Sequence, residues 1–337
     1  MKCTWGNYKE ETSCCDRMFP CSCCGGCGGA PAFWSVNWLA ALVHLLNGVI
    51  TAVLWALSDN RDDVFQLTEE YAPWVPVQNG TCPISQNRII KISDEWCIER
   101  KTEATATLSL WWLIIIFHVL SFLFQAFAMF GWSCKCGAVS CERDYLKEVD
   151  EEGANALRMV EYSISATLMQ VSIGLILGTW NLLVVIGVAV LTAVTMLFGL
   201  LAEQLRQIHI GLAWFAHISG WISMLGVWAI LGRQFLFTIE MSTNAPPDFV
   251  YAIVIVIGAL YMGFGIIQTV QLAMGGDKMI RESSENIPLT EKEVAFNKVL
   301  VDRNRGIEMA YCLNSLISKT FLGWIIFANA LTGMAKS

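Results

Sequence analysis

The chain has 337 residues, of which 55% are hydrophobic and only 15% carry a charge, and its formal net charge is −7. Soluble domains usually carry about 25% charged residues, so this composition excludes an ordinary soluble domain. The charges also crowd into short segments between long apolar runs, and one helical membrane span needs roughly 20 apolar residues. No basic patch with interleaved aromatic residues lies outside these runs, so nucleic acid is not an expected partner.

Seven apolar segments predict an all-α membrane protein, a bundle of seven transmembrane helices. The segments are Trp34–Leu57, Thr107–Trp132, Ala154–Gly178, Asn181–Leu201, Gln207–Gly232, Phe249–Met274 and Gly306–Gly333. A tail rich in Cys and Gly, residues 1–33, precedes this domain, which is expected to span residues 34–333. Long loops are expected at 58–106 and 275–305. Short turns at Thr179–Trp180 and Ala202–Arg206 predict antiparallel packing of the helices that they join.

Lysine and arginine predict the orientation, because they are enriched in cytoplasmic segments. Thirteen lie in the tail and in the second, fourth and sixth loops, and seven lie on the other side. The N-terminus is therefore expected in the cytoplasm. The C-terminus is expected outside the cell or in a lumen, so the protein would reside in the plasma membrane or an endomembrane.

The first long loop has two features of an extracellular or lumenal segment. Asn79-Gly80-Thr81 is an N-glycosylation acceptor, and Cys82 and Cys97 could form a disulfide in an oxidising compartment. Two stretches, near Trp74–Val77 and Ile89–Ile92, look extended and have turn residues between them. Both a small β-hairpin and an irregular glycosylated loop fit this pattern.

Ten of the thirteen cysteines fall on the predicted cytoplasmic side. Disulfides are not expected in a reducing compartment, and cysteines next to a membrane are candidates for palmitoylation. An unmodified tail is the second alternative and a zinc site the third, but the spacing matches no standard zinc pattern, so no metal is expected. These residues are Cys3, Cys14, Cys15, Cys21, Cys23, Cys24, Cys27, Cys134, Cys136 and Cys141.

Two ionisable residues stand out inside the predicted spans. Lys319 lies near the middle of the seventh span and Glu161 lies in the third. A charge at the centre of a bilayer is costly unless it is paired, so a structural ion pair is one reading. A Schiff base is the other, because a desolvated lysine amine is nucleophilic toward an aldehyde and the protonated imine needs a carboxylate counterion.

Most polar residues in the spans lie at one depth, between the membrane midplane and the cytoplasmic end. They are His44, Asn47, Ser121, Gln125, Glu161, Ser165, Ser315 and Lys319, with His118 and His217 near the middle. A proton pump needs relay groups across the whole membrane. A one-sided cluster therefore favours a sensor in which a proton is stored and returned.

Several motifs resemble those of the heliorhodopsin family, an inverted-topology family of retinal-binding rhodopsins. The stretch Arg158–Ser165 (RMVEYSIS) is similar to the family's counterion motif, and Ala310–Trp324, with Lys319, is similar to its retinal-lysine helix. His44-Leu45-Leu46 and Phe249-Val250-Tyr251 match as well. The resemblance runs through nearly all seven spans and leaves out the tail and most of residues 275–305.

The resemblance implies that all-trans retinal is bound to Lys319 with Glu161 as counterion and Ser121 and Ser315 as nearby hydrogen-bonding groups. It also implies a homodimer in which the first loop forms a small sheet. His44 matches one of two histidines in a cytoplasm-facing proton-accepting cavity with Asn47, but the second falls on Gln125, which cannot take a proton. The remaining expected residues are Glu203 and Glu308 at the cytoplasmic mouth, and Tyr162, Ser165, Thr195, Trp214, Tyr261 and Trp324 around the retinal.

The resemblance favours a photosensor without enzymatic activity, which lies among membrane lipid and acts on a cytoplasmic signalling partner that the sequence does not name. The alternative within the family is a light-gated or light-driven proton conductor. A transporter or receptor without retinal, in which Lys319 and Glu161 form only an ion pair, is the third reading.

Overall fold

A computed structural model describes residues 30–58, 64–77, 81–82, 89–91, 93, 95–99, 101–130, 148–243, 246, 248–277, 280 and 289–334. Within these ranges, seven helices are long and apolar enough to cross a membrane. The prediction of an all-α, multi-pass membrane protein with seven spans is therefore confirmed. The glycosylation site at Asn79 and the ten predicted cytoplasmic cysteines lie outside the described residues.

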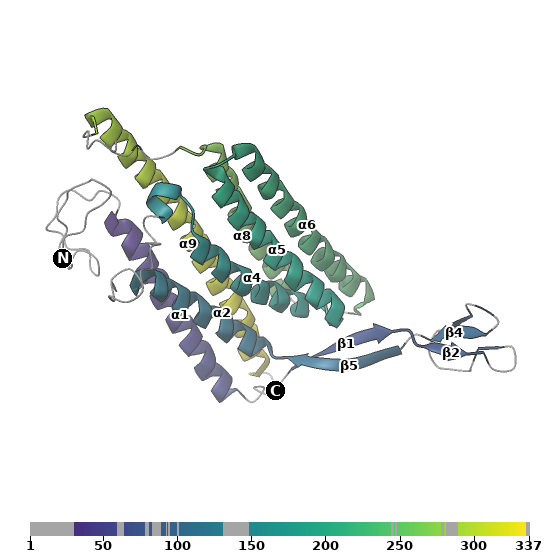
Figure 1. Cartoon of the computed structure of the whole chain (residues 1–337). Coiled ribbons are helices and arrows are strands. Elements are labelled where there is room, and N and C mark those ends of the chain that lie inside the picture. The colour runs from purple at the N-terminus through teal and green to yellow at the C-terminus, as the bar shows by residue number, and fades with distance from the viewer. Residues whose placement is uncertain are drawn as a thin grey trace, which may run out of the picture.

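The helices form one bundle in which consecutive spans pack side by side (Figure 1). They are α1 (Ala30–Leu57), α2 (Leu110–Phe130), α4 (Ala156–Ile176), α5 (Leu182–Arg206), α6 (Ile210–Met241), the composite α7 (Asp248–Ala252), η3 (Ile253–Ile257) and α8 (Gly258–Ala273), and α9 (Glu291–Met334). A π-helical turn, η2 (Glu148–Glu152), precedes α4 and packs on α9.

Three predicted boundaries are wrong, and in each case a helix continues through polar residues. α5 continues through Arg206, whose side chain is buried and donates to the carbonyl oxygens of Glu152 and Gln271. α6 ends at Met241 and α9 begins at Glu291, inside the expected loop 275–305. A hydropathy pattern ends where charge begins, whereas a helix continues as long as its polar side chains find partners or water.

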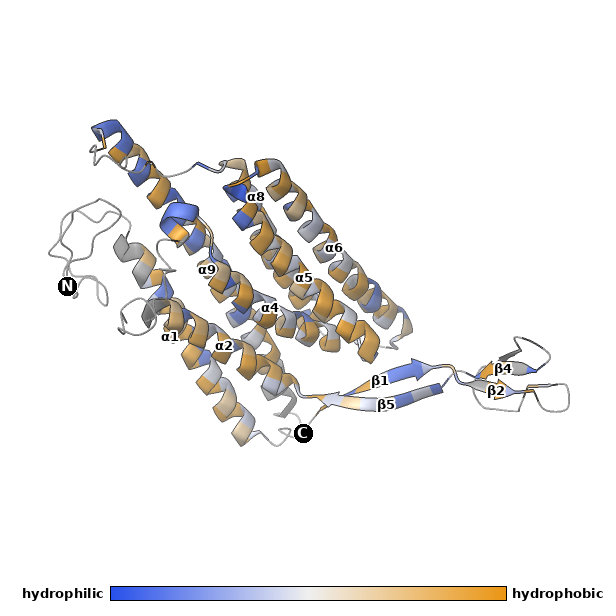
Figure 2. Ribbon diagram, in the orientation of Figure 1, coloured by the Kyte–Doolittle hydropathy of each residue, from blue (hydrophilic) through white to orange (hydrophobic). Residues whose placement is uncertain are grey.

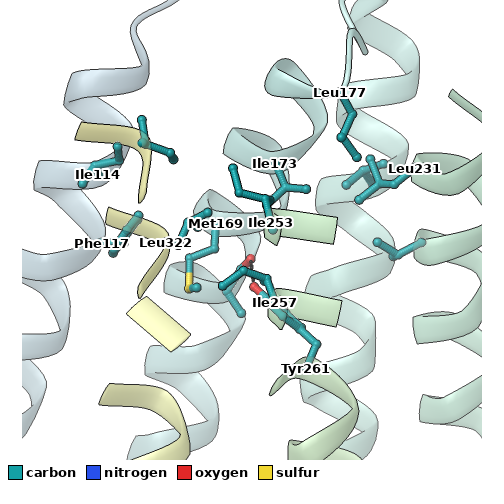
Figure 3. Packing of buried hydrophobic residues seen from close by; sticks show 14 of the residues in the cluster. Ile114, Phe117, Met169, Ile173, Leu177, Leu231, Ile253, Ile257, Tyr261 and Leu322 are labelled. Carbon is teal, nitrogen blue, oxygen red and sulfur yellow. Dashed lines mark hydrogen bonds between the residues drawn. The ribbon is translucent and has the colours of Figure 1, made fainter. Parts of the chain in front are cut away.

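The core is a layer of apolar side chains in the centre of the bundle. Figure 3 shows Met169, Ile173 and Tyr261 meeting Ile253 and Ile257 of the π-helical turn η3. In Figure 2 the spans are largely hydrophobic, while η2 and the first turns of α9 are hydrophilic. The bundle therefore carries its polar residues at one end and in its interior, as expected for helices whose outer surfaces face lipid.

The first loop forms two small sheets that project from the bundle (Figure 1). β1 (Phe65–Tyr71) pairs antiparallel with β5 (Lys101–Leu108), and the ribbon is attached to the bundle by a hydrogen bond of 2.8 Å from Thr68 N to Trp180 O.

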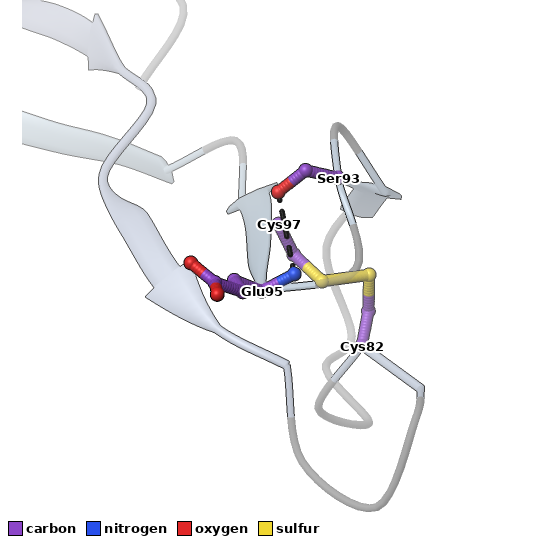
Figure 4. The surroundings of a disulfide bond; sticks show 4 residues. All are labelled: Cys82, Ser93, Glu95 and Cys97. Carbon is purple, nitrogen blue, oxygen red and sulfur yellow. Dashed lines mark hydrogen bonds between the residues drawn. A yellow bond between two sulfur atoms is a disulfide. The ribbon is translucent and has the colours of Figure 1, made fainter.

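The far end of this ribbon is a second sheet closed by a disulfide. It has the strand order β2 (Trp74–Pro76), β4 (Trp96–Glu99) and β3 (Ile89–Lys91), and a disulfide joins Cys82 to Cys97 (Figure 4). Both expected strands are present, but β4 lies between them. The antiparallel pair β3–β4 provides the small β-hairpin that was expected in this loop, and β2 pairs with the other edge of β4.

Candidate functional site

The centre of the bundle contains a lysine, a carboxylate and a hydroxyl from three helices. Nζ of Lys319 on α9 lies 2.6 Å from Oε1 of Glu161 on α4 and 2.6 Å from Oγ of Ser121 on α2. Oγ of Ser121 is also 2.7 Å from Oε1 of Glu161, so the three groups form a closed triangle. All three residues are at most 5% exposed.

The contacts in this triangle offset the free-energy cost of burying a charge. An unpaired buried ion is strongly destabilising, whereas a pair with further hydrogen bonds is tolerated. Glu161 supplies the opposite charge, and Ser121 both accepts from the amine and donates to the carboxylate. The Tyr162 ring lies 5.1 Å from the amine and adds a weakly attractive face.

Lys319 lies at the end of an aromatic hollow. A cavity of about 260 Å³ is lined by Lys319, Ser315, Ser318 and Ser165 together with apolar residues. It shares Tyr162, Met196, Tyr261 and Phe264 with a second cavity of about 490 Å³ that reaches α6. The two hollows therefore lie next to each other between the amine and α6, and the aromatic rings of Tyr162, Tyr261 and Phe264 line both.

Glycines keep the α6 end of this space open. Gly199, Gly220 and Gly265 all line the larger cavity. A Cβ on Gly265 would lie 2.3 Å from the Trp221 ring, and one on Gly220 would lie 3.3 Å from the Phe198 side chain. The indole of Trp221 can lie against α8 only because Gly265 has no side chain.

Four of the six residues expected around the retinal line these cavities, and two do not. Tyr162, Ser165, Thr195 and Tyr261 line one or both. Trp214 instead packs edge-on against His217, which itself lines the larger cavity. Trp324 is 42% exposed and donates through Nε1 to Oδ1 of Asn47. Sequence spacing placed both indoles on the right helices but could not give their direction.

The three residues expected in one proton-accepting cavity have separate partners. Nδ1 of His44 lies 3.2 Å from Nδ1 of His118 on α2. Nδ2 of Asn47 donates to Oγ1 of Thr320 at 3.1 Å, and so links α1 to α9.

Gln125, the third expected member of that cavity, points elsewhere. Its Nε2 is directed at the buried thiol of Cys312 at 3.6 Å. Sequence reasoning missed the contact of Cys312 with this glutamine. It noted His118 but did not predict its contact with His44.

Glu203 and Glu308, which were expected at the cytoplasmic mouth, lie together at the end of the bundle where α4 begins, and both are buried. Both form ion pairs with Arg158, and Asn155 bonds to both carboxylates. The Arg158 guanidinium also lies 4.0 Å from the centre of the Tyr311 ring. The expected mouth is therefore a closed, charge-paired cluster.

A second ion pair closes the same end. Asp150 of η2 accepts two hydrogen bonds, of 2.7 and 2.8 Å, from Arg305 of α9. Nδ2 of Asn304 donates to the Asp150 carbonyl oxygen, and Gln271 of α8 donates to that of Gly153. Sequence reasoning missed Asp150 and Arg305, because both lay in segments expected to be loops, where charge is ordinary.

Fold and site together define a class: a multi-pass seven-helix membrane protein with a buried lysine that lines an aromatic cavity. Residues 33–278, more than half of the chain, match the heliorhodopsin family model. The chain belongs to the heliorhodopsin family, whose members are retinal photoreceptor-type proteins. Lys319 lies beyond the matched residues, so its role depends on the geometry above.

Among solved structures, the thermophilic rhodopsin from Rubrobacter xylanophilus aligns with 86% of this chain and 97% of its own, at 12% identity and a TM-score of 0.45. No curated protein matches the chain.

Proposed function

We propose that this protein is a photosensor in which Lys319 binds all-trans retinal as a protonated Schiff base. The observation that carries the proposal is the buried amine of Lys319 at the end of the aromatic cavity, 2.6 Å from the Glu161 carboxylate. When bound, retinal would supply light absorption and isomerisation. The neighbouring hollows are lined mainly by aromatic residues, Met and Gly, which suits an apolar ligand that is attached at the Lys319 amine.

Some residues of this site would balance the charge on the Lys319 nitrogen, and others would hold the groups in place. Glu161 would balance a positive charge on the Lys319 nitrogen, and Ser121 would hold the two groups in register. Tyr162 and Tyr261 wall the cavity and exclude water, and both are themselves fixed by hydrogen bonds to backbone carbonyl oxygens of Tyr311 and Ala166. A charge held in such a dry site interacts strongly with its neighbours.

The closed cytoplasmic end supports a sensor over a conductor. Arg158 forms ion pairs with both Glu203 and Glu308 beneath η2. A proton that reaches this cluster therefore meets carboxylates whose charge is already balanced by the guanidinium. The stored proton would then return to the Lys319 region, and the protein would act through slow changes of conformation on a cytoplasmic partner.

A light-gated or light-driven proton conductor is the second candidate, and one observation favours it. Buried polar residues recur along α1, and a further one, Ser58, follows its last turn; Asn37, His44, Asn47, Thr51 and Ser58 are each at most 7% exposed. Polar residues inside a membrane often mark an ion or proton path. These residues continue outward past the level of Lys319, so they provide polar groups in the outer half that a pure sensor does not require.

Orientation and assembly belong to the same proposal. The Lys and Arg distribution and the Cys82–Cys97 disulfide support a cytoplasmic N-terminus with the first loop on the oxidising side. The projecting sheets of that loop provide paired-strand surface for a homodimer.

The test begins with adding all-trans retinal to the purified protein. A visible absorption band that bleaches with hydroxylamine supports the Schiff base, and no band would overturn it. Whole-cell recording under illumination at varied voltage then separates the two functions. The sensor predicts no steady photocurrent, whereas a current that follows the proton gradient would establish the conductor.

A further inference from the structure

One wall of the larger cavity carries a run of hydrogen bonds that the triangle around Lys319 does not use. On α6, Nε1 of Trp221 donates to Nε2 of His217 at 3.0 Å, and Nδ1 of His217 lies 2.9 Å from Oε1 of Gln268 on α8. Nε2 of Gln268 then donates to the carbonyl oxygen of Gly199 on α5 at 2.8 Å. All four residues line the cavity, and His217 is only 4% exposed. The run therefore joins three helices around one buried imidazole.

The two ends of this run fix the protonation state of His217. An indole N–H can only donate, so the Nε2 atom that faces Trp221 has to be bare. A carbonyl oxygen can only accept, so Gln268 has to turn its NH₂ group to Gly199 and its oxygen to His217. The hydrogen of the imidazole is then on Nδ1. Both ends thus independently require the same neutral tautomer.

The hydroxyl of Thr269 identifies the group that opposes a second proton. Its Oγ1 lies 2.8 Å from Nε2 of His217 and 2.8 Å from the carbonyl oxygen of Gly265. A proton on Nε2 could be donated to this hydroxyl, which would donate onward to Gly265. The N–H of Trp221, however, would then face another N–H at the same nitrogen. Trp221 is therefore the contact that an imidazolium at this position does not satisfy.

The surroundings of His217 contain no charge that would balance an imidazolium. The described residues that line the larger cavity come from α4, α5, α6, α8 and α9, and none of them is Asp, Glu, Lys or Arg. The other titratable groups among them are the phenols of Tyr162, Tyr261 and Tyr311. Lys319 lines the neighbouring hollow. A positive charge on His217 would thus be unpaired and buried, and its field would act strongly on whatever lies in the cavity.

We propose that His217 sets the absorption wavelength of the pigment by staying neutral, and that Trp221 keeps it neutral. The wavelength part rests on the proposed function, in which a conjugated ligand attached at Lys319 extends toward the wall that contains His217. Light moves positive charge from the nitrogen of a protonated Schiff base toward the far end of the conjugated chain. A cation near that end would raise the energy of the excited state and shift absorption to shorter wavelength. Trp221 is a positioning residue here, because it acts through His217.

The neutral state of His217 is tested without retinal, by NMR on the full chain in lipid nanodiscs with ¹⁵N-labelled histidine. The chain has four histidines, and His217→Gln assigns the signal of interest by its loss. At about pH 5, where an ordinary imidazole is protonated, we expect His217 to be neutral with its hydrogen on Nδ1. Trp221→Phe should give a larger fraction of imidazolium, because Thr269 can then accept from Nε2.

Trp214→Phe is the matched control for the loss of an indole. Trp214 lies on the same helix and packs edge-on against the same imidazole, with ring centres 5.8 Å apart, but it is not part of the run of hydrogen bonds. This variant should leave His217 neutral. Equal imidazolium fractions in the two variants, or a hydrogen on Nε2 of the unmodified protein, would show that Trp221 does not determine the protonation state.

The effect on wavelength is tested on the retinal-loaded protein, with spectra recorded as the pH is lowered to about 5. The band of Trp221→Phe should move to shorter wavelength, whereas those of Trp214→Phe and the unmodified protein should not. Protonation of Glu161 would move a band to longer wavelength, so the sign of the shift distinguishes the two groups. Adding His217→Gln to Trp221→Phe should abolish the shift. A shift that persists in this double variant, or an imidazolium without a shift, would show that His217 does not set the wavelength.

The two proposals fail in different ways. If the unmodified protein forms no visible band, the proposed function is wrong, and the wavelength role of His217 is wrong with it, while the NMR experiment still decides whether Trp221 keeps the imidazole neutral. If a band forms and Trp221→Phe behaves like Trp214→Phe in both experiments, the inference about His217 alone is wrong.

Discussion

Two buried charge clusters lie in the same bundle, and they differ in the cation that each uses. The central site pairs one lysine, Lys319, with Glu161 beside an open cavity. The end of the bundle beside η2, which is expected to be cytoplasmic, pairs Arg158 with Glu203 and Glu308 and pairs Arg305 with Asp150 of η2. A lysine amine can lose its proton and become a nucleophile, whereas a guanidinium stays charged and binds carboxylates in a fixed fork. The first cluster is therefore suited to chemistry and the second to holding helices together.

The largest effect that separates the clusters is loss of the pigment. Lys319→Ala should abolish the visible band formed with retinal, because it removes the only amine among the described residues that line the two cavities. Lys319→Arg should also give no band, although it keeps a positive charge beside Glu161, because a guanidinium does not form the imine. Size-exclusion chromatography checks that both variants remain folded, and a surviving visible band in either variant would refute the Schiff-base assignment.

Disrupting the second cluster, at the end expected to be cytoplasmic, should lower the stability of the protein instead. Arg305→Met leaves the buried Asp150 carboxylate without its bidentate partner, and breaking a buried pair costs about 3–5 kcal/mol. The midpoint of thermal unfolding should fall, while the absorption maximum stays in place. Arg303→Met is the matched control: its partner Asp277 is 51% exposed, and such pairs contribute about 0–1 kcal/mol. Equal losses in the two variants would show that burial does not distinguish the pairs.

Removing the central carboxylate tests the counterion. Glu161→Gln should shift the absorption maximum to longer wavelength, because the positive charge on the Schiff base is no longer held at the nitrogen. It should also move the alkaline titration of the visible band to lower pH, since the protonated form loses its partner. Spectra recorded across a pH series measure both effects, and an unchanged spectrum and titration would assign the counterion to another group.

The smallest effect concerns the hydroxyl in the triangle. Ser121→Ala removes a hydrogen bond to a charged group, which is typically worth about 1.5–3 kcal/mol, so the alkaline midpoint should fall by about one to two pH units. Ser318→Ala is a suitable control, because that hydroxyl lines the same cavity but donates to the Asn314 carbonyl oxygen. Identical shifts in the two variants would mean that general polarity, and not the triangle, sets the titration.

The sequence was sufficient for the parts of this molecule that depend on the membrane. Long apolar runs have to be membrane spans, so seven helices could be predicted. A lysine within a span needs a partner of opposite charge, and this made Glu161 a candidate. The third span could be found in spite of its polar residues, because they recur on the helix face that is now seen to be buried, with Glu161 and Ser165 among them.

The rest depended on contacts between segments distant in sequence. His44 and His118 are 74 residues apart, and the sequence does not indicate that they meet. The start of α9 at Glu291 was missed because its first turns are charged and lie in water. The ribbon of β1 and β5 was missed because its apolar alternation is short: Phe65 and Leu67 in β1 and Ala106 and Leu108 in β5 pack in one cluster, while most other residues of both strands are polar.

The length of α9 has a mechanical consequence. It is one helix of 44 residues, and Glu291 lies 28 residues before Lys319. At 1.5 Å per residue, the N-terminal tip of α9 is about 42 Å from the lysine. A rod of that length amplifies rotation, so a tilt of about 5° at the level of Lys319 moves the tip by about 4 Å. A change too small to rearrange the packing around the amine can thus displace the exposed end by the width of a side chain.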